Sequence, residues 1–205
     1  MTIFDEWDID PAALSSILDA NPSLRGMLLG YVAESKLKEI IQSFKNVSFI
    51  TKFDDHNRKK KGDLYIIYKG RAFDVESKSL QSNMISYDNH LGVWSGKAQV
   101  DASDRRDVVL PNGESLNTTL LLRGEFDILA VNCYAFNNKW NFVFARNSEL
   151  PCSSYKKYTQ YQQQCLIASL IPITLPPSPP FYSNLQALLD EMVASGEGSD
   201  PNILY

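Results

Sequence analysis

The alternation of apolar and polar positions is clearest between residues 63 and 78. Two apolar, alternating runs flank Lys69 and Gly70, a dipeptide that suits a two-residue hairpin turn. Counting outwards from this turn places Asp63 opposite Glu76, and a four-residue loop would keep the same register. A three-residue loop would shift it by one. The period of two then puts Lys78 on the same sheet face as Glu76.

Helices are predicted before this hairpin. Asp10 and Pro11 begin a short helix that runs to about residue 19, and Asn21 and Pro22 begin a longer one that ends near residue 44. The apolar face of the longer helix has helical spacing and consists of Leu37, Ile40, Ile41 and Phe44. A strand over residues 47–53 and a charged loop over residues 54–61 follow.

The middle of the chain mixes weak and strong signals. Residues 79–107 are polar and show no strong periodicity, which is typical of a surface insertion between core strands. Asn112 and Gly113 form the strongest turn signal and predict a hairpin over residues 108–122. Residues 126–136 and 140–145 are apolar and predict two core strands.

The C-terminal part predicts a helix over residues 155–169 after Ser154, and an extended, proline-rich link over residues 172–180. Ser183 is expected to begin a last helix, with an apolar side of Leu185, Leu188, Leu189 and Met192. This order of elements predicts an α/β (α+β) fold with a central mixed β-sheet flanked by helices. We expect residues 1–195 to form one domain and residues 196–205 to be a frayed tail.

Composition supports one soluble domain. The 205 residues are 44% hydrophobic, and no apolar run approaches the ~20 residues that a membrane span needs. The cysteines Cys133, Cys152 and Cys165 show no Cys-x-x-Cys spacing, which favours a reducing cytoplasm. With only His56 and His90 available besides, a zinc site is not expected.

Charge gives a divided indication. The net charge of −4 argues mildly against nucleic acid, because proteins that bind phosphates usually carry basic patches. The positive charge is clustered, however, and residues 58–61 directly precede Asp63. This run is either a solvated loop or a phosphate contact at the mouth of a site, and both interpretations stay open.

The predicted hairpin brings two carboxylates together. Like charges that face each other across a hairpin are destabilising, so Asp63 and Glu76 call for a cation. Hard oxygen ligands with room for water favour Mg²⁺. The alternative is an exposed hairpin whose Lys78 forms an ordinary ion pair with either acid.

Asp63 followed by Glu76-Ser77-Lys78, after a helix that carries Glu34, resembles the PD-(D/E)xK nuclease superfamily, the restriction-endonuclease-like fold. The resemblance covers roughly residues 22–80 and extends loosely to the later strands. It implies that Asp63 and Glu76 bind Mg²⁺, with Glu34 as an auxiliary ligand, and that Lys78 positions or deprotonates the attacking water. Gly62 departs from the family pattern, which has proline there. Glu34 could instead form a surface pair with Lys38.

A Mg²⁺-dependent DNA endonuclease is therefore expected, most simply a type II restriction endonuclease that acts as a homodimer on double-stranded DNA. The alternatives are a repair nuclease or junction resolvase, and a non-catalytic DNA-binding protein of the same fold. The expected DNA contacts are Arg58, Lys59, Lys60, Lys61, Lys97, Gln99, Arg105 and Arg106.

Overall fold

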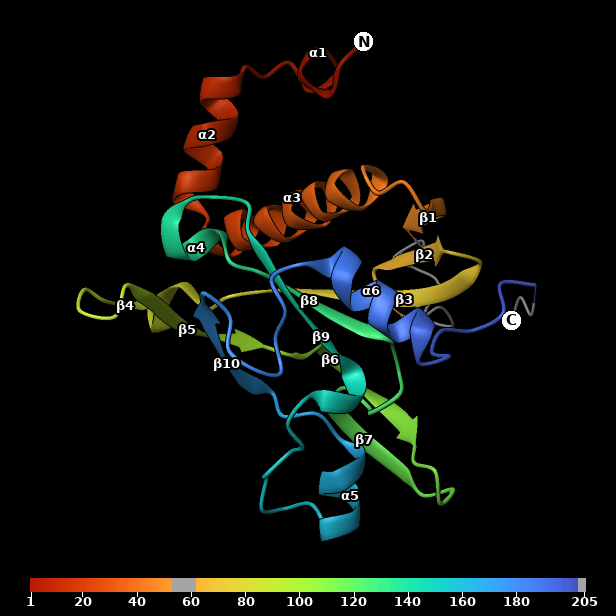
Figure 1. Cartoon of the computed structure of the whole chain (residues 1–205). Helices are drawn as coiled ribbons and strands as arrows, with labels where there is room; N and C mark the ends of the chain where they lie inside the picture. Colours follow the sequence, from red (N-terminus) through yellow and green to blue (C-terminus); the bar gives the residue numbers. More distant parts are fainter. Residues whose placement is uncertain (53–61, 203–205) are drawn as a thin grey trace.

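The computed structural model describes residues 1–52 and 62–202, and its centre is a five-stranded β-sheet (Figure 1). The strands, in the order in which they lie side by side, are β1 (Val47–Lys52), β2 (Leu64–Tyr68), β3 (Arg71–Ser79), β8 (Ile128–Asn132) and β9 (Phe142–Arg146). β3 and β8 run parallel, whereas the other neighbours are antiparallel, so the sheet is mixed. The predicted fold class is confirmed.

The β2–β3 hairpin has the predicted register. Leu64 lies opposite Val75 and Tyr68 lies opposite Arg71, which leaves Lys69 and Gly70 as the turn. Both turn residues have positive φ, 47° and 75°, as a two-residue hairpin turn requires.

Two helices cover one face of this sheet (Figure 1). They are α3 (Pro22–Gln42) and α6 (Leu185–Ala194), and their apolar sides meet the inward residues of β2, β3, β8 and β9 in one buried cluster. All four apolar residues predicted for α6 are buried. In α3, Leu37 and Ile41 are buried, while Ile40 and Phe44 pack at the edge of the same cluster.

A second, three-stranded sheet covers the other face. It consists of β10 (Leu170–Leu175), β5 (Val93–Gln99) and β4 (Ser86–Asp88), in that spatial order. A separate hairpin joins β6 (Asp101–Val109) to β7 (Ser115–Leu120). Residues 79–107 therefore form strands, contrary to the expectation of an irregular insertion. Small buried residues such as Gly96 and Ala98 take the inward positions of β5, so the alternation is weakly apolar.

The remaining elements are short. They are α1 (Ile3–Trp7), α2 (Pro11–Ala20), α4 (Tyr134–Asn137), α5 (Gln160–Cys165) and two 3₁₀ turns, Ser82–Met84 and Asn147–Glu149. Thr159, not Ser154, caps the start of α5. The helix ends before Leu166, because Leu166 and Ile167 are buried and form β-bridges to other segments. Asn184, not Ser183, caps α6.

Two C-terminal expectations also change. Pro172 lies inside β10, which a proline tolerates because β10 is at the edge of its sheet. Residues 196–199 run along β3 instead of fraying: Ser199 and Ala72 exchange two backbone hydrogen bonds of 2.9 Å. The Arg71 guanidinium also donates to the carbonyl groups of residues 196–198. In the part of the chain that the structure describes, no helix is long and apolar enough to cross a membrane.

Gly62 sits at the start of β2 with φ of +70°, and a Cβ added there would lie 3.1 Å from the carbonyl oxygen of Val75. Gly70 has a similar φ of +75° but open space around it. We therefore expect Gly70→Ala to cost about 1 kcal/mol of unfolding free energy through φ alone. Gly62→Ala should cost about 2 kcal/mol or more, because the crowding adds to the strain. Urea unfolding of both variants measures the difference, and equal costs would contradict the close approach.

Candidate active site at the end of the β2–β3 hairpin

Asp63 lies at the point where β2 begins. Its backbone N–H donates to the carbonyl oxygen of Val75 at 2.9 Å, which continues the hairpin ladder by one bond. Its side chain then turns back, and Oδ2 accepts a hydrogen bond from the backbone N–H of Ser77 at 2.7 Å. The carboxylate thus replaces the next backbone acceptor of the ladder. This anchors Asp63 beside the segment that carries Glu76 and Lys78.

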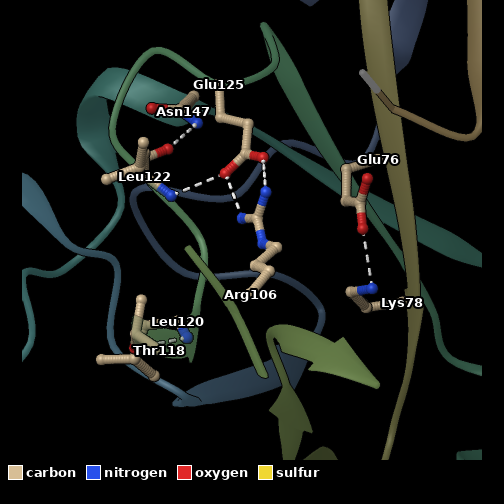
Figure 2. Close-up of polar contacts among 8 residues, drawn as sticks. All are labelled: Glu76, Lys78, Arg106, Thr118, Leu120, Leu122, Glu125 and Asn147. Atoms are coloured by element: carbon tan, nitrogen blue, oxygen red, sulfur yellow. Dashed lines mark hydrogen bonds and ion pairs between the residues drawn. The ribbon is translucent and has the colours of Figure 1, made fainter. Parts of the chain in front are cut away.

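Glu76 and Lys78 project from the same face of β3 and form an ion pair (Figure 2). Lys78 Nζ lies 2.7 Å from Glu76 Oε1, and the two side chains are 21% and 13% exposed, respectively. The neighbouring positions on β8 are Leu129 and Val131, both fully buried. The charged pair therefore borders the core while keeping limited access to solvent.

Burial sets the electrostatics of these three groups. Loss of hydration raises the pKa of Asp63 and of Glu76, and the charge of Asp63 raises the pKa of Glu76 further. Burial alone would lower the pKa of Lys78, but the attraction of Glu76 and Asp63 outweighs it and raises that pKa. Lys78 is therefore held as a charged ammonium group. Burial disfavours the charged form of the Asp63 and Glu76 carboxylates beside it.

Glu34 approaches the site from α3. Lys52, the last described residue of β1, places Nζ 2.6 Å from Glu34 Oε2, and the same Nζ lies 4.4 Å from the centroid of the Tyr31 ring. The surface pair with Lys38 that the sequence left open is not the contact observed. Glu34 Oε2 is buried and receives no hydrogen bond of acceptable geometry. Glu34 raises the pKa of Asp63 and Lys52 lowers it, so both groups act on the site.

A second ion pair adjoins Glu76 on its other side (Figure 2). Both terminal nitrogens of Arg106, on β6, donate to the carboxylate of Glu125, which also accepts from the backbone N–H of Leu122 at 2.9 Å. Glu125 raises the pKa of Glu76. The sequence assigned no role to Glu125, and nothing in the local pattern shows that Arg106 would meet it.

The other expected DNA contacts fall into three groups. Lys97 and Gln99 are exposed on β5, where Gln99 accepts a hydrogen bond from Gln81. Arg105 is exposed on β6 and its guanidinium binds Asn117. Residues 58–61 and His56 lie outside the described residues.

Asp127, directly before β8, is a hydrogen-bonded acid. Its Oδ2 accepts from the backbone N–H of Asp74 at 2.7 Å. This contact joins the start of β8 to β3.

The donor set fits a hard divalent cation. Asp63 and Glu76 offer carboxylate oxygens at one end of the hairpin, whereas the buried oxygen of Glu34 is paired with the Lys52 ammonium group. Among the described residues, no three His, Cys, Asp or Glu side chains are grouped so that they could hold a metal ion. Mg²⁺ is usually held by one or two carboxylates, with water and substrate phosphates completing its shell, so two carboxylates suit it.

Comparison with known proteins adds little to this picture. No protein-family model and no curated protein matches the chain. Among solved structures there is a weak likeness to the bacterial homing endonuclease I-Ssp6803I, with a TM-score of 0.40 and 14% identity. It covers 83% of this chain and 97% of that one. A likeness at this level carries no weight for function, which is inferred below from the geometry of the site.

The raised pKa of Asp63 predicts how stability depends on pH. Between its unfolded value of about 3.9 and its higher folded value, the native state binds more protons than the unfolded state, so stability falls as pH rises. Asp63→Asn keeps an acceptor for Ser77 but removes the charge. Urea unfolding should therefore show the variant gaining stability over the wild type as pH rises through this window, up to a plateau above it.

Asp190 supplies a control of opposite sign. Hydrogen bonds from Lys69 and Tyr68 lower the pKa of Asp190, so Asp190→Asn should lose stability relative to the wild type as pH rises.

Added Mg²⁺ should stabilise the wild type and have no effect on Asp63→Asn. Equal Mg²⁺ stabilisation of both proteins would show that Asp63 is not a ligand.

Proposed function

We propose that the protein is a Mg²⁺-dependent deoxyribonuclease that cleaves phosphodiester bonds in double-stranded DNA, as a sequence-specific type II restriction endonuclease does. The observation that carries the proposal is the gathering of Asp63, Glu76 and Lys78 at one end of the β2–β3 hairpin. Two buried carboxylates and an ammonium group are the chemistry that the PD-(D/E)xK resemblance requires, and the raised pKa values of the carboxyls are typical of functional sites.

Asp63 and Glu76 would hold the metal ion, and Glu34 would become a third oxygen donor on leaving its ion pair with Lys52. When bound, Mg²⁺ supplies Lewis-acid stabilisation of the phosphate charge and acidifies a water molecule. The chain contributes the placement of these donors. The Ser77 N–H fixes one oxygen of Asp63, and the strand geometry of β3 fixes the backbone of Glu76.

Lys78 would position the attacking water and the scissile phosphate. Its ammonium group is held 2.7 Å from Glu76, so it stands beside the carboxylates without being a ligand. Neutralisation of Glu76 and Asp63 by a cation would remove the attraction that raises the pKa of Lys78. Burial would then favour loss of its proton, which would allow Lys78 to accept one from water.

Contacts to the DNA backbone are proposed for exposed cations on β5 and β6. Lys97 on β5 and Arg105 on β6 are exposed, and Gln99 is exposed two residues after Lys97. The basic residues 58–61 directly precede the site in the chain. Cations in these positions would bind phosphates irrespective of sequence, whereas Gln99 has the amide group that base reading requires.

Cleavage of plasmid DNA separates the possible functions. Discrete fragments that require Mg²⁺ and disappear with EDTA indicate a restriction endonuclease. Nicks confined to damaged or branched DNA indicate a repair nuclease or junction resolvase. Binding without cleavage indicates a non-catalytic protein in which the Glu76–Lys78 ion pair is only structural.

Removing either carboxylate charge should abolish cleavage. Asp63→Asn and Glu76→Gln keep hydrogen-bond acceptors in place, so the fold should persist, but each removes a negative metal ligand. DNA binding should stay intact or strengthen, because less negative charge opposes the phosphate. Gel-shift and cleavage assays on the same preparations measure both effects, and circular dichroism checks the fold. Retained cleavage in both variants would disprove the site.

Lys78→Ala should reduce the cleavage rate by ~10²–10⁴-fold with metal binding nearly intact, since an ammonium group is not a ligand. Lys36 offers a matched control, because Glu34-Ser35-Lys36 repeats the Glu-x-Lys triplet on a helix. In the structure Lys36 pairs with Glu39 on the exposed side of α3. Lys36→Ala should therefore leave single-turnover rates almost unchanged. Equal losses in both variants would exclude the hairpin site.

A further inference from the structure

The N-terminal arm, residues 1–31, carries large apolar side chains that the rest of the chain does not bury. Neither α1 nor α2 buries a residue, and the first buried residue of α3 is Ala33. Figure 1 shows α1 and α2 projecting beyond the two sheets. The large apolar side chains exposed along the arm are Ile3, Trp7, Ile17, Leu24, Met27, Leu28 and Tyr31.

Four of these residues form a regular stripe on α3. Leu24, Met27, Leu28 and Tyr31 follow the spacing i, i+3, i+4 and i+7, which places them on one face of the helix. At 100° per residue, this face lies roughly 130° around the helix from the buried face of Ala33, Leu37 and Ile41. α3 thus has two apolar faces, and only the second is covered by the sheet.

Such an arm needs cover to be stable in water. Isolated helices shorter than about 12–15 residues are marginal, and α2 has 10 residues without a buried side chain. An exposed apolar patch of this kind marks an interaction surface. The 31 residues of the arm match the roughly 20–30 residues that each partner contributes to a standard interface.

Charge indicates what the arm binds. Residues 1–20 contain five acidic residues and no Lys, Arg or His, which argues against nucleic acid and anionic lipid as partners of α1 and α2. Residues 21–52 contain five basic residues and two acidic ones, a net charge of 5 − 2 = +3. The acidic first two helices are therefore followed by a segment of net positive charge.

We infer that the arm is the dimer interface and that its occupant is the arm of a second copy. A two-fold axis near Met27 and Leu28 would pair the α3 stripes in antiparallel fashion. The acidic α1 and α2 of one copy would then lie towards Lys38 of the partner subunit, which is on the stripe side of α3, so opposite charges would face each other on both sides of the axis. The choice of a second copy also rests on the proposed function, because one hairpin site per chain must act twice to cut both strands.

Sedimentation velocity of the full chain, without metal or DNA, tests the inference. The wild type should sediment as a dimer, and Met27→Glu should sediment as a monomer at the same concentration. Met27 is 58% exposed, so the substitution does not touch the core. Leu91→Glu is the matched control, because Leu91 is 75% exposed in the turn before β5 and should remain dimeric. A monomeric wild type, or a dimeric Met27→Glu, would overturn the inference.

A second measurement does not depend on a variant. Amide hydrogen exchange over residues 11–20 should slow as the wild-type concentration rises, whereas exchange in β8 should not change. Exchange that is independent of concentration in α2 would contradict the interface. Failure of the proposed function is distinguishable: a dimer that never cleaves DNA leaves the interface standing. If both hold, Met27→Glu should convert double-strand cleavage into nicking.

Discussion

The register of the β2–β3 hairpin is the constraint on which the rest of the molecule depends. Because successive side chains of a strand point to opposite faces, Phe73 and Val75 enter the helix-covered core only if Glu76 and Lys78 point the other way. A slip by one residue would move the charges into that core and the apolar side chains out of it. The packing energy of the core therefore also fixes the geometry of the site, and no separate device is needed to hold it.

The charged groups of the site work against that stability, because burying their carboxylates costs free energy. Asp63, Glu76 and Glu125 are acids at the edge of the core, and the cations that face them do not remove the effect of burial on the pKa of Asp63 and Glu76. A structural ion-pair network would be expected to hold carboxyl pKa values down, as Lys69 and Tyr68 do for Asp190. Burial makes the difference, because it also raises the pKa of Asp127, whose carboxylate binds the backbone of Asp74.

Features set by neighbouring residues could be predicted from the sequence, whereas contacts between separate segments could not. The hairpin, the two longer helices and the place of Asp63, Glu76 and Lys78 follow from local alternation, turn residues and a short motif. The partner of Glu34 is Lys52 and the partner of Glu125 is Arg106, and each pair joins two different segments of the chain. No local pattern specifies such pairs. β5 was not predicted because its inward residues are small. α5 is shorter than predicted because the residues after it form β-bridges to other segments.

α3 connects the proposed interface with the proposed site. Its first turns carry the exposed stripe, and its later turns carry Glu34 and the core residues, within a single helix of 21 residues. Tyr31 belongs to both regions: it ends the stripe, and its ring lies under Lys52, which pairs with Glu34. Glu34 and Lys52 act in opposite directions on the pKa of Asp63, so this ion pair joins α3 and β1 electrostatically to the end of the hairpin.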